Sequence, residues 1–160
     1  MPPYIELVKK ERLSNSFRLN EPLATYTSWR IGGTGELYVA PSSEEEIMDI
    51  VAFARTYGIP ITPLGGGSNV LISDKGLKGI VLHITHRISK IQFLDNERVR
   101  IFAGTRLGVL IRQTMKRGLS GIERLWGIPG TIGGAVVMNA GACHWEFFDV
   151  VESVNSLTTD

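Results

Sequence analysis

Hydrophobic residues recur at helical spacing in the first half of the chain. Ser43 and Glu46 form a capping box of the kind that opens a helix, and Gly58 is placed to follow its end. Between them the apolar positions repeat at i, i+3, i+4 and i+7, as on one face of a helix: Ile47, Ile50, Val51 and Ala54. The pattern predicts a helix here, flanked by strands at residues 36–40 and 60–64. Together they have the usual size of a β-α-β crossover unit.

The second half of the chain repeats this alternation of strands and one amphipathic helix. Strands are predicted at residues 79–84, 88–94, 99–103 and 150–157, with a turn at residues 95–97. Thr105 is expected to cap a helix that Gly118 ends. Its core face would be formed by Leu107, Leu110, Ile111, Thr114 and Met115. A short amphipathic helix is also predicted over residues 4–13.

Two clusters of glycine interrupt these elements. The first is the run from Leu64 to Leu71, which contains Gly65, Gly66, Gly67, Ser68 and Asn69. The second runs from Gly127 to Ala135 and is followed by Asn139-Ala140-Gly141-Ala142. Glycine allows positive φ and lets a ligand approach the main chain closely. Successive N–H groups can then form an anion-binding nest, so two clusters indicate a ligand with a phosphate or pyrophosphate.

The first cluster matches neither common phosphate-binding loop. A dinucleotide-binding Rossmann loop requires a third glycine where this chain has Val70, and a Walker loop requires a lysine that is missing here. The apolar run Val70–Asp74 predicts a strand, which would make the cluster a strand–loop–strand connection. A plain glycine turn in a hairpin is the alternative for this cluster taken alone.

Composition excludes several other classes of protein. The chain has 160 residues, 43% of them hydrophobic and 21% charged, which is typical of one globular domain or two small lobes. A net charge of +1 gives no reason to expect a nucleic-acid partner. No apolar run approaches the roughly 20 residues of a membrane span, and the N-terminus does not resemble a signal peptide. A single cysteine, Cys143, fits a reducing compartment, so we expect the cytoplasm.

The order of the motifs resembles the UDP-N-acetylenolpyruvoylglucosamine reductases (MurB). The resemblance rests on residues 26–33 (Tyr-Thr-Ser-Trp-Arg-Ile-Gly-Gly), the two glycine clusters, and Gly121-Ile122-Glu123 between them. It implies an α+β fold, a two-lobed FAD-binding domain of the vanillyl-alcohol-oxidase/PCMH type. Residues 1–78 would form the first lobe and residues 79–160 an incomplete second lobe.

The resemblance also implies an activity. Members of this family are NADPH-dependent FAD oxidoreductases that reduce an enolpyruvyl group in peptidoglycan precursor synthesis. Their substrate-binding domain, with the catalytic serine, would follow position 160, so this chain would carry no catalytic residue and be inactive alone. Truncation of the second lobe within a sheet would allow self-association through the open edge.

Carried over position by position, the family's motifs assign the cofactor-binding residues. The FAD pyrophosphate would be bound by the first cluster: Leu64, Gly65, Gly66, Gly67, Ser68 and Asn69. The other side of the cofactor would be lined by the second: Ile128, Pro129, Gly130, Thr131, Gly133, Gly134 and Ala135, with Asn139, Gly141 and Ala142 nearby. Cys143 and His144 depart from the family's pattern. Another flavin oxidoreductase of the same fold, or a non-catalytic nucleotide-binding module, remains an alternative function.

The remaining chemically reactive residues have simpler interpretations. His83 and His86 lack a third ligand, so no metal site is predicted. Cys143 beside His144 could be a redox pair, but a partly buried, unreactive cysteine is the preferred interpretation. Trp29 is expected to be a core residue, with stacking on an adenine as the alternative.

Overall fold

The computed structural model describes residues 17–95 and 97–157, which form two compact units. The first unit comprises the described residues up to Ile84 together with Leu157, and the second spans Thr85–Ser156. The lobe boundary predicted between residues 78 and 79 falls inside a strand, so the division between the compact units lies later in the chain. The helix predicted over residues 4–13 lies outside the described residues.

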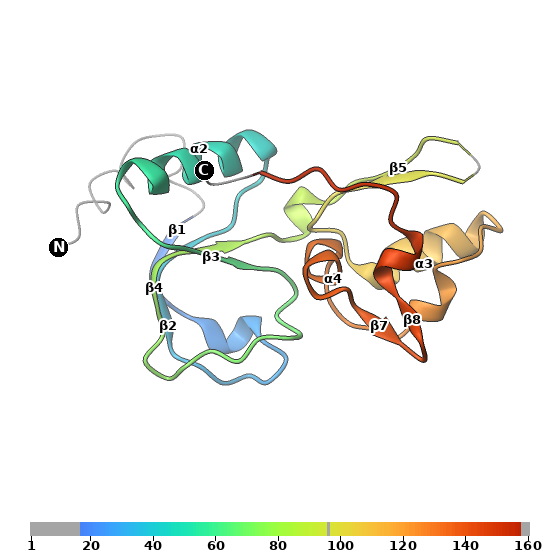
Figure 1. Cartoon of the computed structure of the whole chain (residues 1–160). Coiled ribbons are helices and arrows are strands. Elements are labelled where there is room, and N and C mark those ends of the chain that lie inside the picture. The colour runs from blue at the N-terminus through green and yellow to red at the C-terminus, as the bar shows by residue number, and fades with distance from the viewer. Residues whose placement is uncertain (1–16, 96, 158–160) are drawn as a thin grey trace. The chain divides into compact units, whose positions relative to one another are not determined.

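The first unit is built on a mixed four-stranded sheet (Figure 1). Its strands are β1 (Phe17–Pro22), β2 (Thr34–Val39), β3 (Ile61–Leu64) and β4 (Leu77–His83), in the order β1-β2-β4-β3. β1 is antiparallel to β2, whereas β2 and β3 both run parallel to β4. The predicted β-α-β crossover is therefore present, but β4 occupies the position between its two strands.

This sheet is covered on both faces. On β2, Leu37 and Val39 belong to the apolar cluster with Ile50 and Ala54 of the helix α2 (Glu44–Thr56). Tyr38, between them in sequence, points to the opposite face because side chains alternate along a strand. That face is covered by the short 3₁₀ helix η1 (Leu23–Tyr26) and by irregular segments rather than by a second α-helix (Figure 1).

The ends of α2 follow the sequence prediction with one difference. The Ser43 hydroxyl accepts a hydrogen bond from the Glu46 backbone N–H at 3.2 Å, which is the expected N-cap contact. The Glu46 carboxylate does not complete a capping box with Ser43; it accepts instead from the Ser42 N–H at 2.6 Å. Gly58 has φ of +62° just beyond the helix, as expected of a residue in that place.

The second unit consists of short elements around one apolar core. Its strands form two hairpins, β5 (Ile91–Phe93) with β6 (Val99–Ile101) and β7 (Gly141–Ala142) with β8 (Trp145–Glu146). Its helices are α3 (Leu107–Lys116), α4 (Ile132–Met138) and the 3₁₀ helices η2 (His86–Ile88), η3 (Glu123–Leu125) and η4 (Phe147–Val150). The core contains Leu107, Leu110, Ile111, Leu125, Ile132, Ala135 and Phe147.

Several predicted elements of this unit are wrong in detail. The N-cap of α3 is Arg106, whereas Thr105 is fully buried and its hydroxyl contacts that of Ser89 at 3.2 Å. Met115 is 57% exposed and lies outside the core. The strand predicted at residues 88–94 is reduced to Ile91–Phe93, because the residues before it form η2.

The strand predicted at residues 150–157 is also wrong. Val150 ends η4, and residues 151–157 adopt no regular secondary structure. The prediction of self-association relied on an open sheet edge at this place, and the described residues contain no such strand. Self-association itself stays a prediction, without this support.

Candidate functional site

The first glycine cluster lies in the first unit, directly after β3. We call Gly65–Asn69 the first glycine segment; Gly66 and Asn69 are exposed, and Gly67 is buried. The segment leads into a loop rather than a strand, so the strand predicted at Val70–Asp74 is wrong. The exposed backbone of this loop leaves room for a ligand that approaches the main chain.

The backbone N–H groups of the first glycine segment are unused within the described part of the chain. None of the five amides from Gly65 to Asn69 donates a hydrogen bond to another described group. Most backbone donors in folded proteins have a partner in the protein or in water. Five successive free donors are what an anion-binding nest requires.

The carbonyl groups of the same segment are held from the protein side. The Gly65 carbonyl accepts a hydrogen bond from His83 Nε2 at 3.1 Å, and the Gly67 carbonyl accepts from the Ser28 N–H at 3.0 Å. In a trans peptide the N–H points opposite to the C=O. The N–H of Gly66 therefore points away from His83, and that of Ser68 points away from Ser28.

Gly67 is required by the local packing. Its φ is +67°, and a Cβ at this position would overlap the backbone carbonyl oxygen of Tyr26. Both the backbone conformation and the lack of space exclude a side chain. The sequence predicts positive φ or close phosphate approach as the reason for this glycine. The structure shows the positive φ and, in addition, a close contact with the chain itself.

A polar network lies beneath the first glycine segment. His83 Nδ1 lies 2.6 Å from the Tyr38 hydroxyl, and the rings of Tyr38 and Tyr26 stack with centroids 4.8 Å apart. The Tyr26 hydroxyl donates to the Glu21 carboxylate at 2.6 Å, and Arg18 pairs with the same carboxylate at 2.8 Å. The network therefore connects β1, η1, β2 and β4 to one carbonyl of the loop.

Burial is the main influence on the pKa of His83 and on that of Tyr38. It lowers the pKa of His83, although the hydrogen bond to the Gly65 carbonyl acts in the opposite direction. Burial also raises the pKa of Tyr38, so its hydroxyl stays protonated and can donate. Because a carbonyl can only accept, the neutral His83 ring carries its proton on Nε2 and accepts from Tyr38 at Nδ1.

The second glycine cluster lies in the second unit and passes directly into α4. We call Gly127–Ala135 the second glycine segment. Thr131 pairs with Arg106 in an isolated antiparallel bridge, and the Ile132 and Gly133 amides donate to the carbonyls of Thr105 and Ala103. A Cβ on Gly133 would lie 3.1 Å from that of Ala103, which explains the small residue there. This cluster is thus more regular than the sequence indicated.

Four amides of this segment remain available. Those of Gly127, Gly130, Thr131 and Gly134 donate no hydrogen bond among the described residues. The Thr131 hydroxyl is also unusual, because Thr131 is 7% exposed and its Oγ1 has no hydrogen-bond partner in the structure. A buried hydroxyl without a partner costs free energy, so an unpaired one requires an explanation.

Asn139 and the hairpin that follows it have a structural role. Asn139 adopts the left-handed conformation, with φ of +44°, at the end of α4. Its amide oxygen accepts from the Phe148 N–H at 3.0 Å, and its amide nitrogen donates to the Glu146 carboxylate. The amide oxygen and the amide nitrogen of Asn139 therefore both have hydrogen-bond partners. These hydrogen bonds support the following hairpin, whose first strand is Gly141–Ala142.

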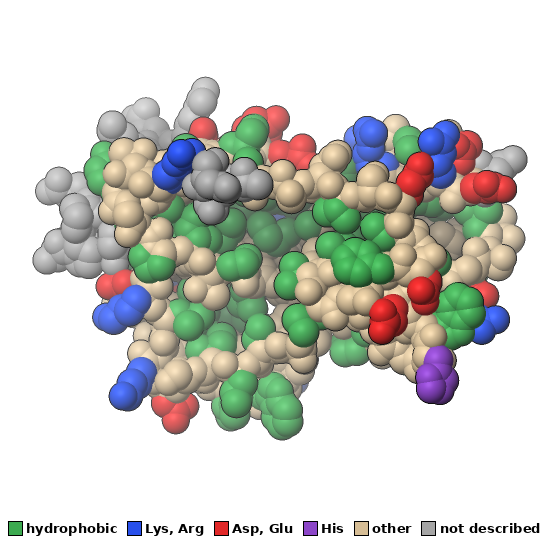
Figure 2. Space-filling model, in the orientation of Figure 1, with side chains coloured by type: hydrophobic (Ala, Val, Ile, Leu, Met, Phe, Trp, Pro, Cys, Tyr) green, Lys and Arg blue, Asp and Glu red, His purple; other side chains and the backbone are tan. Residues whose placement is uncertain are grey.

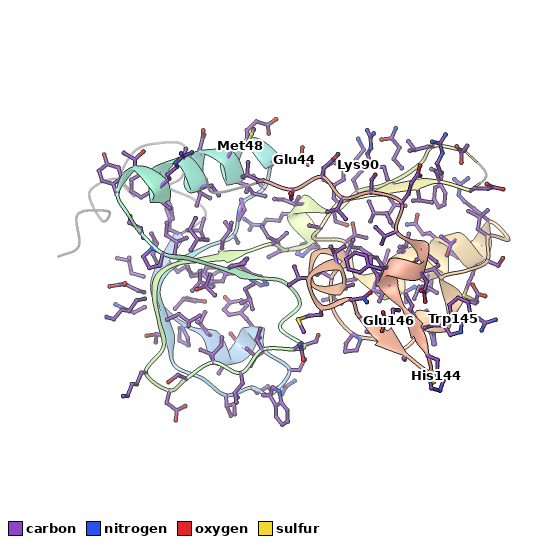
Figure 3. All side chains as sticks on the ribbon, in the orientation of Figure 1. Glu44, Met48, Lys90, His144, Trp145 and Glu146 are labelled. Atoms are coloured by element: carbon purple, nitrogen blue, oxygen red, sulfur yellow. The ribbon has the colours of Figure 1, made fainter. Side chains whose placement is uncertain are left out.

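Cys143 and His144 form the exposed turn between β7 and β8. Both have positive φ, +53° and +66°, and both are exposed. Figure 3 labels His144 at the tip of the hairpin, pointing away from it, and Figure 2 shows an exposed imidazole at the same place. The expectation of a partly buried cysteine is wrong. Trp29 is also 67% exposed, so its assignment to the core is wrong as well.

The described residues bear on two other classes of function. They contain no group of three or more His, Cys, Asp or Glu side chains that could hold a metal ion. None of the helices in the described part of the chain is long and apolar enough to cross a membrane.

The chain combines an α+β fold with two glycine segments that carry unpaired amides, and comparison with known proteins identifies its class. Residues 35–160 match the FAD binding domain family, so the chain belongs to that family. The predicted α+β fold of the vanillyl-alcohol-oxidase/PCMH type and the prediction of FAD as cofactor are confirmed.

The most informative relatives are UDP-N-acetylenolpyruvoylglucosamine reductases. That of Synechococcus sp. (strain JA-3-3Ab) is 48% identical over 91% of this chain and 46% of its own length. That of Rubrobacter xylanophilus is 42% identical over 82% of this chain and 44% of its own. The chain thus spans a little under half the length of the curated relatives it matches. The resemblance drawn from the sequence motifs is confirmed.

Comparison with solved structures also finds a reductase of this kind. The crystal structure of UDP-N-acetylenolpyruvylglucosamine reductase (MurB) from Thermus caldophilus superposes with a TM-score of 0.66 at 33% identity, covering 81% of this chain and 45% of that one. Alkyldihydroxyacetonephosphate synthase has a TM-score of 0.55 at 24% identity, covering 74% of this chain and 25% of that one. The second likeness concerns the fold alone.

The sequence did not reveal the supporting residues of the first glycine segment. His83 was considered only as a metal ligand, and Tyr38 was considered only as part of a strand. The one available signal was a histidine at the end of an otherwise apolar strand, which is compatible with many environments. The role of Thr131 as an unpaired buried hydroxyl was likewise visible only in the structure.

Proposed function

We propose that this chain is the FAD-binding portion of a UDP-N-acetylenolpyruvoylglucosamine reductase, an enzyme that uses NADPH to reduce an enolpyruvyl group in peptidoglycan precursor synthesis. The observation that carries the proposal is the run of five free backbone amides from Gly65 to Asn69. The family match and the names of the relatives support FAD as the ligand.

The first glycine segment would hold the FAD pyrophosphate. Backbone N–H groups can bind a diphosphate without lysine, because several donors share the negative charge. Ser68 and Asn69 add side-chain donors next to the exposed amides. Leu64 is 5% exposed and its carbonyl accepts from the Ile84 N–H, so its contribution would be to fix the start of the loop.

The second glycine segment would contact another part of the cofactor. The amides of Gly127, Gly130, Thr131 and Gly134 are the donors available there, and the Thr131 hydroxyl is the buried group that lacks a partner. The proposed set also keeps the remaining residues assigned from the family's motifs: Ile128, Pro129, Gly133, Ala135, Asn139, Gly141 and Ala142. Ile128 and Pro129 supply apolar surface for a flavin ring.

This chain would bind and orient the cofactor, and no catalytic residue is assigned to it. Bound FAD supplies hydride transfer from NADPH to the enolpyruvyl carbon. Protonation and positioning of the substrate would be performed by the part of the relatives' sequence that this chain does not cover. We place the complete enzyme in the cytoplasm, which fits a chain with one cysteine.

Binding of FAD to the purified chain tests the proposal. We expect non-covalent binding, seen as quenching of flavin fluorescence and as heat in titration calorimetry. Release of all flavin by acid precipitation would confirm that the bond is non-covalent. Absence of binding at tens of micromolar FAD would contradict the proposal.

Turnover distinguishes the proposed enzyme portion from a complete oxidoreductase of the same fold. We expect NADPH oxidation by the FAD-loaded chain, if there is any, to be unchanged when UDP-N-acetylenolpyruvoylglucosamine is added. A positioned general acid typically contributes about 10²- to 10⁴-fold, and none is assigned here. A substrate-dependent rate from the homogeneous chain would show that one of its own residues performs chemistry.

A further inference from the structure

The first glycine segment presents its amides because two carbonyls on its inner side are held in place. Gly67 is held by the Ser28 backbone, which any sequence could provide. Gly65 is held by a side chain, His83, at 3.1 Å. The orientation of the Gly65–Gly66 peptide plane therefore depends on one imidazole of β4.

That imidazole is itself fixed on its other nitrogen. The Tyr38 hydroxyl lies 2.6 Å from Nδ1, and the Tyr26 ring meets the imidazole edge-on at 5.2 Å between centroids. Tyr38 is 5% exposed, which restricts it to few rotamers. Among the described residues, Glu21 and Arg18 are the charged groups of this network, and they contact Tyr26 rather than His83.

We propose that His83 and Tyr38 form a positioning pair that sets the orientation of the Gly65–Gly66 peptide so that the Gly66 amide is directed at the diphosphate of the cofactor. The pair acts through the carbonyl of Gly65 and does not itself touch the ligand. Tyr38 selects the tautomer by donating to Nδ1, and the Nε2–H then donates to the carbonyl. This inference rests on the proposed function, because it requires FAD to bind at the first glycine segment.

Without the pair the peptide loses the contact that defines its plane. Glycine on both sides of this peptide leaves φ and ψ unusually free, so a released Gly65 carbonyl can rotate outward and face the anion. A carbonyl oxygen directed at a phosphate repels it, whereas an N–H binds it. The pair should therefore affect ligand affinity more than the stability of the unit.

Four variants separate this role from a structural one. His83→Phe removes both hydrogen bonds, and His83→Gln keeps an N–H donor near the Nε2 position. Tyr38→Phe removes only the hydroxyl. Tyr57→Phe is the matched control, since Tyr57 is 51% exposed at the end of α2. Each is measured for FAD affinity by fluorescence quenching and, without FAD, for its free energy of unfolding in urea.

We expect His83→Phe to weaken FAD binding at least tenfold and His83→Gln to restore most of that loss. Tyr38→Phe should weaken binding about threefold or more, and Tyr57→Phe should leave it unchanged. Nitrogen-15 NMR of the His83 ring should show the neutral Nε2–H tautomer at pH 7 in the wild type. In Tyr38→Phe the ring should titrate at higher pH, because the neutral form loses its donor.

The outcomes distinguish failure of the positioning pair from failure of the proposed function. Wild-type affinity in folded His83→Phe, or an Nδ1–H tautomer in the wild type, would overturn the positioning pair while leaving the proposed function intact. A wild-type chain that binds no FAD would overturn both. If His83→Phe does not fold, the comparison of Tyr38→Phe with Tyr57→Phe decides, and equal affinities would contradict the inference.

Discussion

At the scale of single residues, the candidate site is defined by polar groups that the protein leaves unpaired. The Thr131 hydroxyl is buried without a partner, and the amides of the first glycine segment have none among the described residues. Folded proteins pair such groups because an unsatisfied buried donor or acceptor costs about 1–3 kcal/mol. We propose that a ligand is the partner of the buried Thr131 hydroxyl and of the loop amides.

Replacing Thr131 by valine should therefore have opposite effects on stability and on binding. Thr131→Val keeps the shape and removes the unpaired hydroxyl, which makes no capping hydrogen bond to α4. We expect the FAD-free chain to be unchanged or up to about 1 kcal/mol more stable in urea unfolding. FAD affinity should fall by several fold. A variant that is less stable and binds FAD normally would show that the hydroxyl has a structural partner.

Gly67 allows a test of local packing with an internal control. Gly67 and Gly58 have nearly the same φ, +67° and +62°, but a Cβ on Gly58 has nothing within 4 Å. Gly58→Ala should therefore cost only the strain of the left-handed conformation, about 1–2 kcal/mol. Gly67→Ala should cost clearly more, because its Cβ overlaps the Tyr26 carbonyl. Equal losses in urea unfolding would mean that the loop can relax away from Tyr26.

At the scale of elements, α2 is a helix whose start is marked in the sequence by its N-cap residue and which covers one face of the sheet. The helix buries Ile50 and Ala54 against β2 and β4, and Ser43 caps the amide end of its first turn. Met48 lies on the exposed side of the same helix, where Figure 3 labels it pointing away from the sheet. The cap, the apolar face and the following glycine agree with one another, which is why this element was predictable.

Removal of the cap should destabilise the first unit measurably. Ser43→Ala leaves the Glu46 N–H without its acceptor and should cost about 1 kcal/mol of unfolding free energy. Thr56→Ala at the other end of the helix is the control; its hydroxyl donates to the Ala52 carbonyl in an exposed position. Alanine favours the helix, so this change should cost little. A loss in Thr56→Ala as large as in Ser43→Ala would argue against the cap.

At the scale of the whole molecule, the candidate ligand-binding groups are divided between two compact units. The first glycine segment belongs to the first unit, and the second belongs to Thr85–Ser156. Each unit has its own apolar core. If a segment contributes to ligand binding, the addition of the ligand should stabilise the unit that contains it.

Hydrogen exchange with and without FAD tests the contribution of each segment separately. We expect slower exchange at residues 65–69 and 130–134 on addition of FAD, with no change near Gly58, which lies outside both glycine segments. At FAD concentrations of about 100 times Kd the stabilisation should approach roughly 2.7 kcal/mol. Protection of only one segment would mean that the other does not contribute to binding.

The sequence predicted the parts of this molecule that depend on local chemistry. α2, the strands β2, β3 and β4, and the turn in which Asp95 accepts from the Glu97 and Arg98 amides all follow from periodicity and capping residues. The order of the glycine motifs was sufficient to identify the family. The element signals lie within a few residues of one another, and the order of the motifs is read along the chain, so neither needs knowledge of long-range contacts.

Tertiary structure decided the remainder. It placed β4 between β2 and β3, moved the division between the units to Ile84, and left residues 151–157 outside any strand. It also brought Tyr38 and His83, 45 positions apart in the chain, to within 2.6 Å. Such pairings depend on which strands are neighbours, and a side chain's partner across a sheet leaves no pattern in the sequence around it. The glycine motifs could therefore be read from the sequence, but the groups that orient their backbone could not.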